Sequence, residues 1–523
     1  MKKAFIILLA SLGFISCVED EGNYDYVELN QITIEGLEES YNVLDKVDSI
    51  KIYPTIKGTL LGDDLSNYEY QWHIHEGLNE HKHTILSYEK DLEYKVDLGI
   101  GTYTLYFTVK DKATGLEAQA YSSIKTQTAI SKGFMLLGDD MEEGIMGLDM
   151  IVMPAGRDTT VAENVYDNSE TKFKGADRIL YQGARYIVPD KESVWMCTED
   201  GSFRMEHHEG IFEIISEIND YNMIETDFEH KEMRVKDVFP HPFNNYGNSY
   251  NCSYSNRGYM TEDMIVIGSV STTEYYATPC NRRSADATEL FEFFPFMFYH
   301  EAQNNGYTNT FLIYNKTDNC FMKTYWNLTR ASHCVSPGID YSTDYFPWDQ
   351  NGTGRTLVWG ANTLDASGHS LALMKDEAGK YFLYKFIAGG SYGIFSLSKK
   401  GFYEIDLNLA PHFAEASHYM ASATGAGGSL LMYTYGSTLY LYNYAYKTIA
   451  EINLGEEITC IEPEYASAGS RTSFFVATYS DSEKGTVRKY DTSTNPNTLE
   501  IIERPGEVWK TRLRVKDIEW KSN

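Results

Sequence analysis

A two-strand unit that recurs from residue 133 to the end of the chain constrains the fold most strongly. Each unit has a short apolar run, a polar turn and a second run that alternates. Short apolar runs between turn residues are typical of buried strands, and alternation is typical of half-buried ones. The apolar runs are residues 134–137, 193–197, 264–267, 311–314, 371–374, 430–433 and 474–478.

These units predict a β-propeller-like domain of about seven blades over residues 133–523. Their spacing, roughly 45 to 70 residues, lies in the range of blade repeats once inserted loops are allowed for. A ring of blades also removes the sheet edges that so many strands would otherwise expose. The alternative is a series of two or three β-sandwiches with similar hairpins.

Residues 30–128 predict a separate β-sandwich of the Ig/PKD-like kind. Strand patterns rich in aromatic and β-branched residues cover residues 49–54, 68–74 and 102–111, and their regular spacing is typical of sandwiches. Trp72, in the middle of the second pattern, is expected to point into the core. The predicted fold class is therefore all-β throughout.

The N-terminus predicts export. Lys2 and Lys3 precede an apolar stretch over residues 4–15, which is too short to span a bilayer and suits a signal peptide. Ser16 then places a small residue directly before Cys17, as in the lipobox of bacterial lipoproteins. We therefore expect residues 1–16 to be a lipoprotein signal peptide and Cys17 to carry the lipid anchor. The alternative is an ordinary signal peptide with a chance cysteine.

Residues 17–29 read as an acidic tether, since Glu19, Asp20 and Glu21 follow the anchor cysteine. The stretch Gly-Asn-Tyr-Asp-Tyr at residues 22–26, followed by residues 30–34 and the Trp72 sandwich, resembles the PKD-like family of Bacteroidetes lipoproteins. The resemblance implies an accessory protein of SusC/SusD-like, TonB-dependent importers of glycans or peptides, exposed on the outer membrane. It implies no catalytic residues.

The net charge of the chain argues against anionic partners. The chain has 45 Lys and Arg against 75 Asp and Glu, a net charge of −30, which would repel nucleic acid and an anionic membrane surface. We therefore expect no nucleic-acid partner, and contact with the membrane through the lipid anchor alone. The 41 Tyr residues outnumber the 25 Phe and 7 Trp together, which suits both strands and wet binding surfaces.

In an exported protein the six cysteines after Cys17 are able to form disulfide bonds, but a chain of this length does not depend on them. Two pairs bracket loop-rich stretches and are the first candidates for disulfides: Cys252 with Cys280, and Cys320 with Cys334. None of the six has C-x-x-C spacing, so a zinc ribbon or thioredoxin-like site is not expected. The remaining two cysteines are Cys197 and Cys460.

Four histidines form two H-x-H pairs and are weak candidates for a metal site: His73, His75, His81 and His83. Residues i and i+2 of a strand share a face, so each pair presents two imidazoles to one side. The alternative is a polar strand end and loop. The acidic turn at residues 139–143 is a weaker candidate for calcium, because it lacks the D-x-D-x-D-G pattern. We therefore predict no cofactor.

Two insertions have the composition of binding loops, because they mix aromatic residues with Asn, Ser and Gly. They span residues 237–259 and 338–355, and their rings form a candidate contact surface: Tyr246, Tyr250, Tyr254, Tyr341, Tyr345, Phe346 and Trp348. The alternative is that these rings pin the loops to the body of the domain.

The sequence therefore predicts a cell-surface lipoprotein that binds an extracellular peptide or glycan, or serves a SusC/SusD-type importer. It contains no G-x-S-x-G, H-E-x-x-H or Walker A motif in the structural context that the chemistry of each requires, and no catalytic residue is predicted. One alternative is a surface-anchored propeller hydrolase, which paired carboxylates in the central funnel, one with a raised pKa, would support. A second alternative is an adhesin or scaffold.

Overall fold

The computed structural model describes most of the chain between residues 28 and 521. The described residues are 28–60, 62, 64–76, 83–154, 157–166, 171–182, 193–208, 211–218, 233–239, 256–269, 279–299, 311–325, 333–338, 345–363, 369–389, 396–421, 429–464, 472–493 and 498–521. The predicted signal peptide, the predicted anchor Cys17 and most of the predicted tether lie outside them.

The described chain is all-β, as predicted, and its helical content is one 3₁₀ turn, η3 (Phe413–Glu415). The chain divides into two compact units, Met1–Gln127 and Thr128–Asn523. Among the described residues, no helix has the length and apolar character needed to cross a membrane.

The first unit is built on a five-stranded sheet. Its order is β2 (Ser40–Leu44), β9 (Glu117–Gln127), β8 (Gly101–Asp111), β5 (Tyr68–Glu76) and β6 (His83–Ser87). The β2–β9 pair is parallel and the other pairs are antiparallel. Two two-stranded sheets complete the unit: β1 (Ile32–Glu35) with β4 (Thr55–Gly58), and β3 (Ser49–Ile52) with β7 (Leu92–Lys95).

One hydrophobic core joins these sheets into a sandwich. Trp72 of β5 is 0 % exposed and stacks on Phe107 of β8, with ring centroids 4.1 Å apart. Its indole nitrogen donates a hydrogen bond to the carbonyl oxygen of Glu89 at 3.0 Å. Residues of the small sheets, such as Ile50 and Ile56, pack into the same cluster. The sequence predictions of a sandwich and of an inward Trp72 are therefore confirmed.

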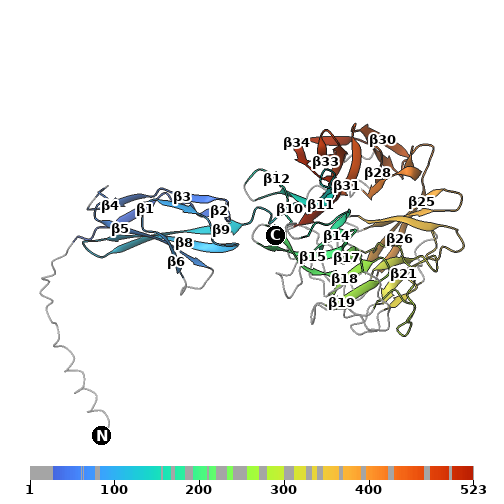
Figure 1. Ribbon diagram of the computed structural model, residues 1–523, viewed down its shortest axis with the longest axis horizontal. Coiled ribbons are helices and arrows are strands. Elements are labelled where there is room, and N and C mark those ends of the chain that lie inside the picture. Colours follow the sequence, from blue (N-terminus) through green and yellow to red (C-terminus); the bar gives the residue numbers. More distant parts are fainter. Residues whose placement is uncertain are drawn as a thin grey trace, which may run out of the picture. The chain divides into compact units, whose positions relative to one another are not determined.

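The described residues of the second unit form seven successive antiparallel sheets, which we number 1 to 7 in chain order (Figure 1). Sheet 1 is β12 (Thr160–Ala162), β11 (Ile145–Val152), β10 (Gly133–Asp140) and β35 (Arg514–Lys521). Sheet 2 is β13 (Ala176–Gln182), β14 (Ser193–Thr198), β15 (Gly201–His208) and β16 (Ile211–Glu217). Sheet 3 is β17 (Val235–Phe239), β18 (Asn256–Thr261) and β19 (Ile265–Ser269).

The remaining four sheets follow the same pattern. Sheet 4 is β20 (Leu312–Asn315), β21 (Cys320–Tyr325) and β22 (His333–Val335). Sheet 5 is β23 (Thr356–Asn362), β24 (Ser370–Lys375), β25 (Tyr381–Gly389) and β26 (Ser396–Glu404). Sheet 6 is β27 (His418–Ala421), β28 (Leu430–Tyr435), β29 (Thr438–Asn443) and β30 (Thr448–Asn453). Sheet 7 is β31 (Glu457–Pro463), β32 (Ser473–Ser480), β33 (Lys484–Thr492) and β34 (Ile501–Thr511).

Each of the seven predicted apolar runs falls in a different sheet. Five of them lie one strand in from an end of sheets 1, 2, 5, 6 and 7. The run at residues 311–314 lies on the end strand β20 of sheet 4, and the run at residues 264–267 lies on the end strand β19 of sheet 3. The propeller-like fold is therefore confirmed. Each sheet is open, and none curls into a barrel.

Seven hydrophobic clusters join these sheets in a cycle. One cluster lies between each pair of successive sheets, for example between sheet 5 and sheet 6, where Leu373 and Tyr433 are both 0 % exposed. The remaining cluster joins sheet 7 to sheet 1 and packs Phe134 against Phe475 and Trp520. Packing between neighbours therefore stabilises every sheet from both faces.

The C-terminal strand completes the first sheet. β35 pairs with β10 along its length, from Gly133 opposite Lys521 to Asp139 opposite Arg514. At the same junction, the buried carboxylate of Asp149 accepts hydrogen bonds from the Thr511 hydroxyl of sheet 7 and from the Asn164 N–H at 2.9 Å. Both ends of the second unit therefore meet in one sheet.

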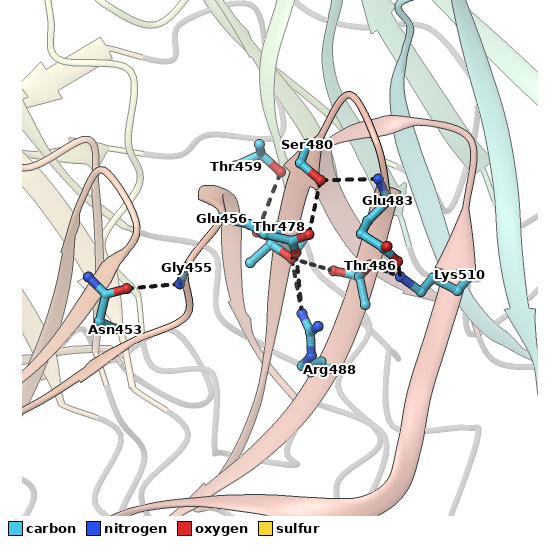
Figure 2. Close-up of polar contacts among 11 residues, drawn as sticks. Asn453, Gly455, Glu456, Thr459, Thr478, Ser480, Glu483, Thr486, Arg488 and Lys510 are labelled. Atoms are coloured by element: carbon cyan, nitrogen blue, oxygen red, sulfur yellow. Dashed lines mark hydrogen bonds and ion pairs between the residues drawn. The ribbon is translucent and has the colours of Figure 1, made fainter.

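Polar contacts hold sheet 7 together at its turns (Figure 2). Glu456 accepts hydrogen bonds from the hydroxyls of Thr478, at 2.8 Å, and Ser480, at 3.0 Å, and Arg488 donates to Thr478 at 3.0 Å. Burial opposes the charge of Glu456, but these hydroxyls and Arg488 outweigh it, so its pKa is lowered. The carboxylate therefore ties β32 and β33 to the start of β31.

Candidate functional site

A central cavity of about 480 Å³ lies within the second unit. The innermost strand of six sheets lines it: β13, β17, β23, β27, β31 and β35. Sheet 4 contributes residues 294–299, a segment that reaches β20 through isolated bridges of Phe293 to Asn315 and Phe298 to Leu312. Every sheet therefore presents side chains to one shared space.

Part of the cavity wall is aromatic. Trp359 of β23 and Tyr419 of β27 lie beside each other, with ring centroids 5.9 Å apart. The Tyr419 hydroxyl donates a hydrogen bond to the Phe413 carbonyl at 2.6 Å, which fixes the orientation of its ring. The other aromatic lining residues are Phe294, Phe296, Tyr299 and Trp520. Flat apolar faces are therefore available to a ligand.

The rest of the wall is charged, with acids in excess. Five carboxylates line the cavity against two bases: Asp177, Asp237, Glu462, Asp517 and Glu519 against Arg178 and Lys516. Burial works against the charge of Arg178, but the carboxylates of Asp177, Asp517 and Asp237 outweigh it, so the pKa of Arg178 is raised. The field in the cavity therefore favours neutral or cationic groups.

Asp517 has the most unusual carboxyl group in the cavity. Burial raises its pKa to about 6, and the nearby Arg178 offsets part of that rise. One carboxyl oxygen accepts a hydrogen bond from the Ile179 N–H at 2.8 Å, and the other accepts from the Ile518 N–H at 3.1 Å. Asp517 is therefore partly protonated near neutral pH and also links β35 to β13.

Three potential metal ligands meet beside this carboxyl group. A sulfur or oxygen atom from each of Cys460, Glu462 and Asp517 lies within 4.8 Å of the others. Burial raises the pKa of the Cys460 thiol well above its usual value, whereas metal ligation requires the thiolate. Asp517 already accepts a backbone N–H at each oxygen. This chemistry fits a structural junction better than a metal centre.

The predicted contact surface is only partly within the described residues. Tyr246, Tyr250, Tyr254 and Tyr341 lie outside them. Phe346 and Trp348 are 2 % and 8 % exposed and pack with Tyr384 and Phe386 in the core between sheets 4 and 5. A ligand surface made by these two rings is therefore a wrong prediction, because they pin the loop to the body. Tyr345 is 46 % exposed.

The acidic turn after β10 is engaged by protein groups. Asp140 accepts hydrogen bonds from the N–H groups of Glu142 and Glu143 and from the Arg512 guanidinium. Lys484 lies 2.7 Å from the Glu142 carboxylate, and Asp139 accepts the Ala176 N–H at 2.8 Å. Protein groups therefore engage the carboxylates of Asp139, Asp140 and Glu142 in this turn.

Cys320 and Cys334, one of the two candidate disulfide pairs, are not bonded to each other in the structure, where both are free thiols. The fully buried Cys334 instead donates its S–H to the Cys280 carbonyl oxygen at 3.2 Å, and it also contacts the Cys280 thiol. Cys252, the predicted partner of Cys280, lies outside the described residues. The sequence placed these cysteines in loop-rich stretches, whereas packing between sheets 3 and 4 determines their neighbours.

The structure describes three of the four histidines that were weak candidates for a metal site. His73, His75 and His83 lie together on the first unit, and His81 lies outside the described residues. None of the residues lining the central cavity was singled out from the sequence. The signal was weak, because the innermost strands mix polar and apolar residues and are far apart in the chain.

Comparison with known proteins adds a family for the N-terminal part. Residues 17–175 match the PKD-like family. The match covers the first unit and continues through β10, β11 and β12 of sheet 1. The first unit is therefore PKD-like, as the resemblance implied. No curated protein sequence matches the chain.

Solved structures offer only distant similarity. A quinonprotein alcohol dehydrogenase-like protein from Bacteroides thetaiotaomicron is 11 % identical, with 94 % of this chain and 99 % of that chain covered and a TM-score of 0.35. The extracellular domain of a one-component system from the same species is 9 % identical, with 77 % and 52 % covered and a TM-score of 0.31. The fold assignment rests on the sheets and their packing.

Proposed function

We propose that this protein is an exported, lipid-anchored binding protein of the outer-membrane surface that holds an extracellular peptide or glycan in its central cavity. The observation that carries the proposal is the convergence of all seven sheets on one cavity with aromatic and carboxylate walls. Its volume of about 480 Å³ falls in the range of ligand sites, roughly 300 to 1,000 Å³.

The lining supports recognition of a polar ligand that has apolar faces. The rings of Trp359 and Tyr419 offer stacking surfaces, and the carboxylates accept hydrogen bonds from hydroxyl, amide or ammonium groups. The excess of acids disfavours anionic ligands. Neutral glycans and neutral or cationic peptides therefore both remain within the proposal.

Export and the accessory role rest on the sequence and on the family match. The lipobox-like residues before Cys17 and the match of residues 17–175 to the PKD-like family support a surface lipoprotein. The same resemblance supports work beside a SusC/SusD-type importer. Cys17→Ala should release the protein from membranes, and affinity isolation of the intact protein should recover importer subunits. Full membrane retention of the variant would exclude the anchor, and recovery of the protein alone would count against the importer.

The cavity is tested by a binding screen with a matched pair of variants. Defined peptides and oligosaccharides are titrated calorimetrically into the full chain, the Trp359→Leu variant and the Tyr446→Leu control, whose side chain is exposed and outside the cavity. Loss of the stacking face should weaken binding at least tenfold in Trp359→Leu and leave the control unchanged. Equal affinity in both variants would place the ligand elsewhere.

A second candidate function is hydrolysis of a peptide or glycan. The raised pKa of Asp517 and its proximity to Glu462 favour it, since a protonated carboxyl beside a carboxylate is a general acid–base pair. Against it, both oxygens of Asp517 accept backbone N–H groups. If the protein is a hydrolase, Asp517→Asn abolishes turnover of the bound ligand, and a wild-type chain that binds without turnover excludes this function.

A further inference from the structure

Three histidines lie side by side on the outer face of the five-stranded sheet. His73 and His75 alternate along β5 with the buried Trp72 and Ile74, so both imidazoles point away from the core. His83 of β6 is directly opposite His75 in the register. The ring centroids are 5.3 Å apart for His73 and His75, 5.7 Å for His73 and His83, and 5.8 Å for His75 and His83.

The nitrogens of these rings are not committed to other described groups. Within residues 28–521, as far as the structure describes them, none of the three imidazoles makes a hydrogen bond or an ion pair. The Nδ1 atom of His73 is buried without a hydrogen-bond partner, which is an energetic cost unless something else satisfies it. The ring nitrogens of the three histidines are therefore available as metal ligands.

The local surroundings hold the rings in place. Tyr106 of β8 stacks on His73, with centroids 5.2 Å apart, and meets His75 edge-on at 5.1 Å. Burial, together with the neighbouring His75 and His83, lowers the pKa of His73. Neutral imidazole is the form that ligates metals.

The spacing of the rings suits a tetrahedral ion. Three imidazole nitrogens about 2.0 to 2.1 Å from a tetrahedral Zn²⁺ place the ring centroids roughly 5 Å apart, close to the separations observed. In the present rotamers, the ring nitrogens do not all lie within 4.8 Å of one another. Rotation about the side-chain bonds is therefore needed, and the exposed position of His83 gives it room.

We propose that His73, His75 and His83 form a surface site for a divalent transition-metal ion, with Zn²⁺ as the ion of choice and water in the fourth position. An all-imidazole set favours zinc, copper or nickel over calcium or magnesium, which prefer oxygen ligands. The site lies on the PKD-like unit and is independent of the central cavity and its ligand.

Calorimetric titration of the full chain with zinc sulfate at pH 7.5 tests the site. The protein is prepared without a polyhistidine tag. The variant His75→Thr is compared with the control His412→Asn, which removes an exposed histidine of the second unit. Threonine suits the strand position of residue 75, and asparagine suits the left-handed backbone of residue 412, where φ is 56°. We expect one zinc ion per chain, at least tenfold weaker binding in His75→Thr and unchanged binding in His412→Asn.

Two further measurements test the coordination geometry of the site and the competition between protons and metal for its imidazoles. Substituting cobalt should give the visible absorption of a tetrahedral ion in wild type and lose it in His83→Gln, while the far-ultraviolet dichroism of both proteins stays the same. Affinity should also fall at least tenfold at pH 5.5, because protons compete for the imidazoles. Absence of stoichiometric zinc binding, or binding that survives His75→Thr unchanged, would overturn the proposal.

Discussion

At the centre of the second unit, the surroundings of Asp517 decide its protonation. In the sequence it stands between Lys516 and Ile518 in an ordinary alternating strand, and nothing there marks it as special. In the fold, Arg178 lies beside it and the Ile179 N–H, 338 positions away in the chain, donates to it. Long-range contacts of this kind are the part of a site that local patterns do not contain.

Asp517 gives a pH prediction with a definite sign. Its folded pKa of about 6 lies above the ordinary value of 3.8, so the folded state binds more protons between these values. The carboxyl group therefore contributes most below about pH 4, and its contribution is lost as the pH rises through 6. Relative to Asp517→Asn, wild type should lose at most about 3 kcal/mol of unfolding free energy between pH 4 and 7, measured by urea unfolding.

Asp140 provides a control, because its pKa is shifted in the opposite direction to that of Asp517. Burial opposes its charge, but the N–H groups of Glu143 and Glu142 and the guanidinium of Arg512 lower its pKa. Its contribution is therefore present above its unfolded pKa and is lost as the pH falls. If Asp517→Asn and Asp140→Asn altered the pH profile in the same direction, the raised pKa of Asp517 would be refuted.

Among the elements, strands with a simple burial pattern were predictable and those with a mixed one were not. Seven apolar runs and the alternating β3, β5 and β8 could be read from the sequence, because their faces see either core or solvent. The innermost strands face the cavity on one edge and neighbours on the other, so their composition is mixed. Phe346 and Trp348 were misread for the related reason that loop aromatics serve packing and binding equally well.

The contact between Cys280 and Cys334 predicts a disulfide other than the two expected. Both thiols are free in the structure and fully buried between sheets 3 and 4. Because they contact each other, we expect the bond to form when the chain refolds with oxidised glutathione. The two thiols lose two protons and pass two electrons to the glutathione disulfide. Closing a loop of this length should add about 4 kcal/mol to the unfolding free energy.

Peptide mapping after alkylation in denaturant identifies the pair. Cys320→Ser should leave the cross-linked peptide intact, whereas Cys334→Ser should remove it. A cross-link that contains Cys320, or refolded protein in which Cys280 and Cys334 both alkylate, would contradict the predicted pairing.

For the whole molecule, the all-β class and the two-part architecture were predictable because they depend on patterns repeated along the chain. The cavity was not, because its wall takes residues from seven sheets. β35 is the strand on which this arrangement depends most, since it pairs with β10, packs in the cluster between sheets 7 and 1 and contributes Lys516, Asp517 and Glu519 to the cavity.

Removal of residues 514–523 should therefore prevent the second unit from folding. The loss exposes the edge of β10 and the apolar face around Phe134 and Phe475, a cost of several kcal/mol on the scale of about 25 cal/mol per Å² of apolar surface. Limited proteolysis should degrade the second unit and spare the PKD-like unit. A control that lacks only residues 522–523 keeps β35 whole and should resist; equal resistance of both truncations would disprove the dependence.

The pairing of Gly133 with Lys521 also sets an order of events in time. A ribosome makes β10 early and β35 at the end of the second unit, so the first sheet lacks its innermost strand through nearly the whole of that synthesis. During that interval β10 has an open edge and an uncovered apolar face. Folding of this unit is therefore completed only once β35 has been made, and the early strands stay exposed to wrong pairing until then.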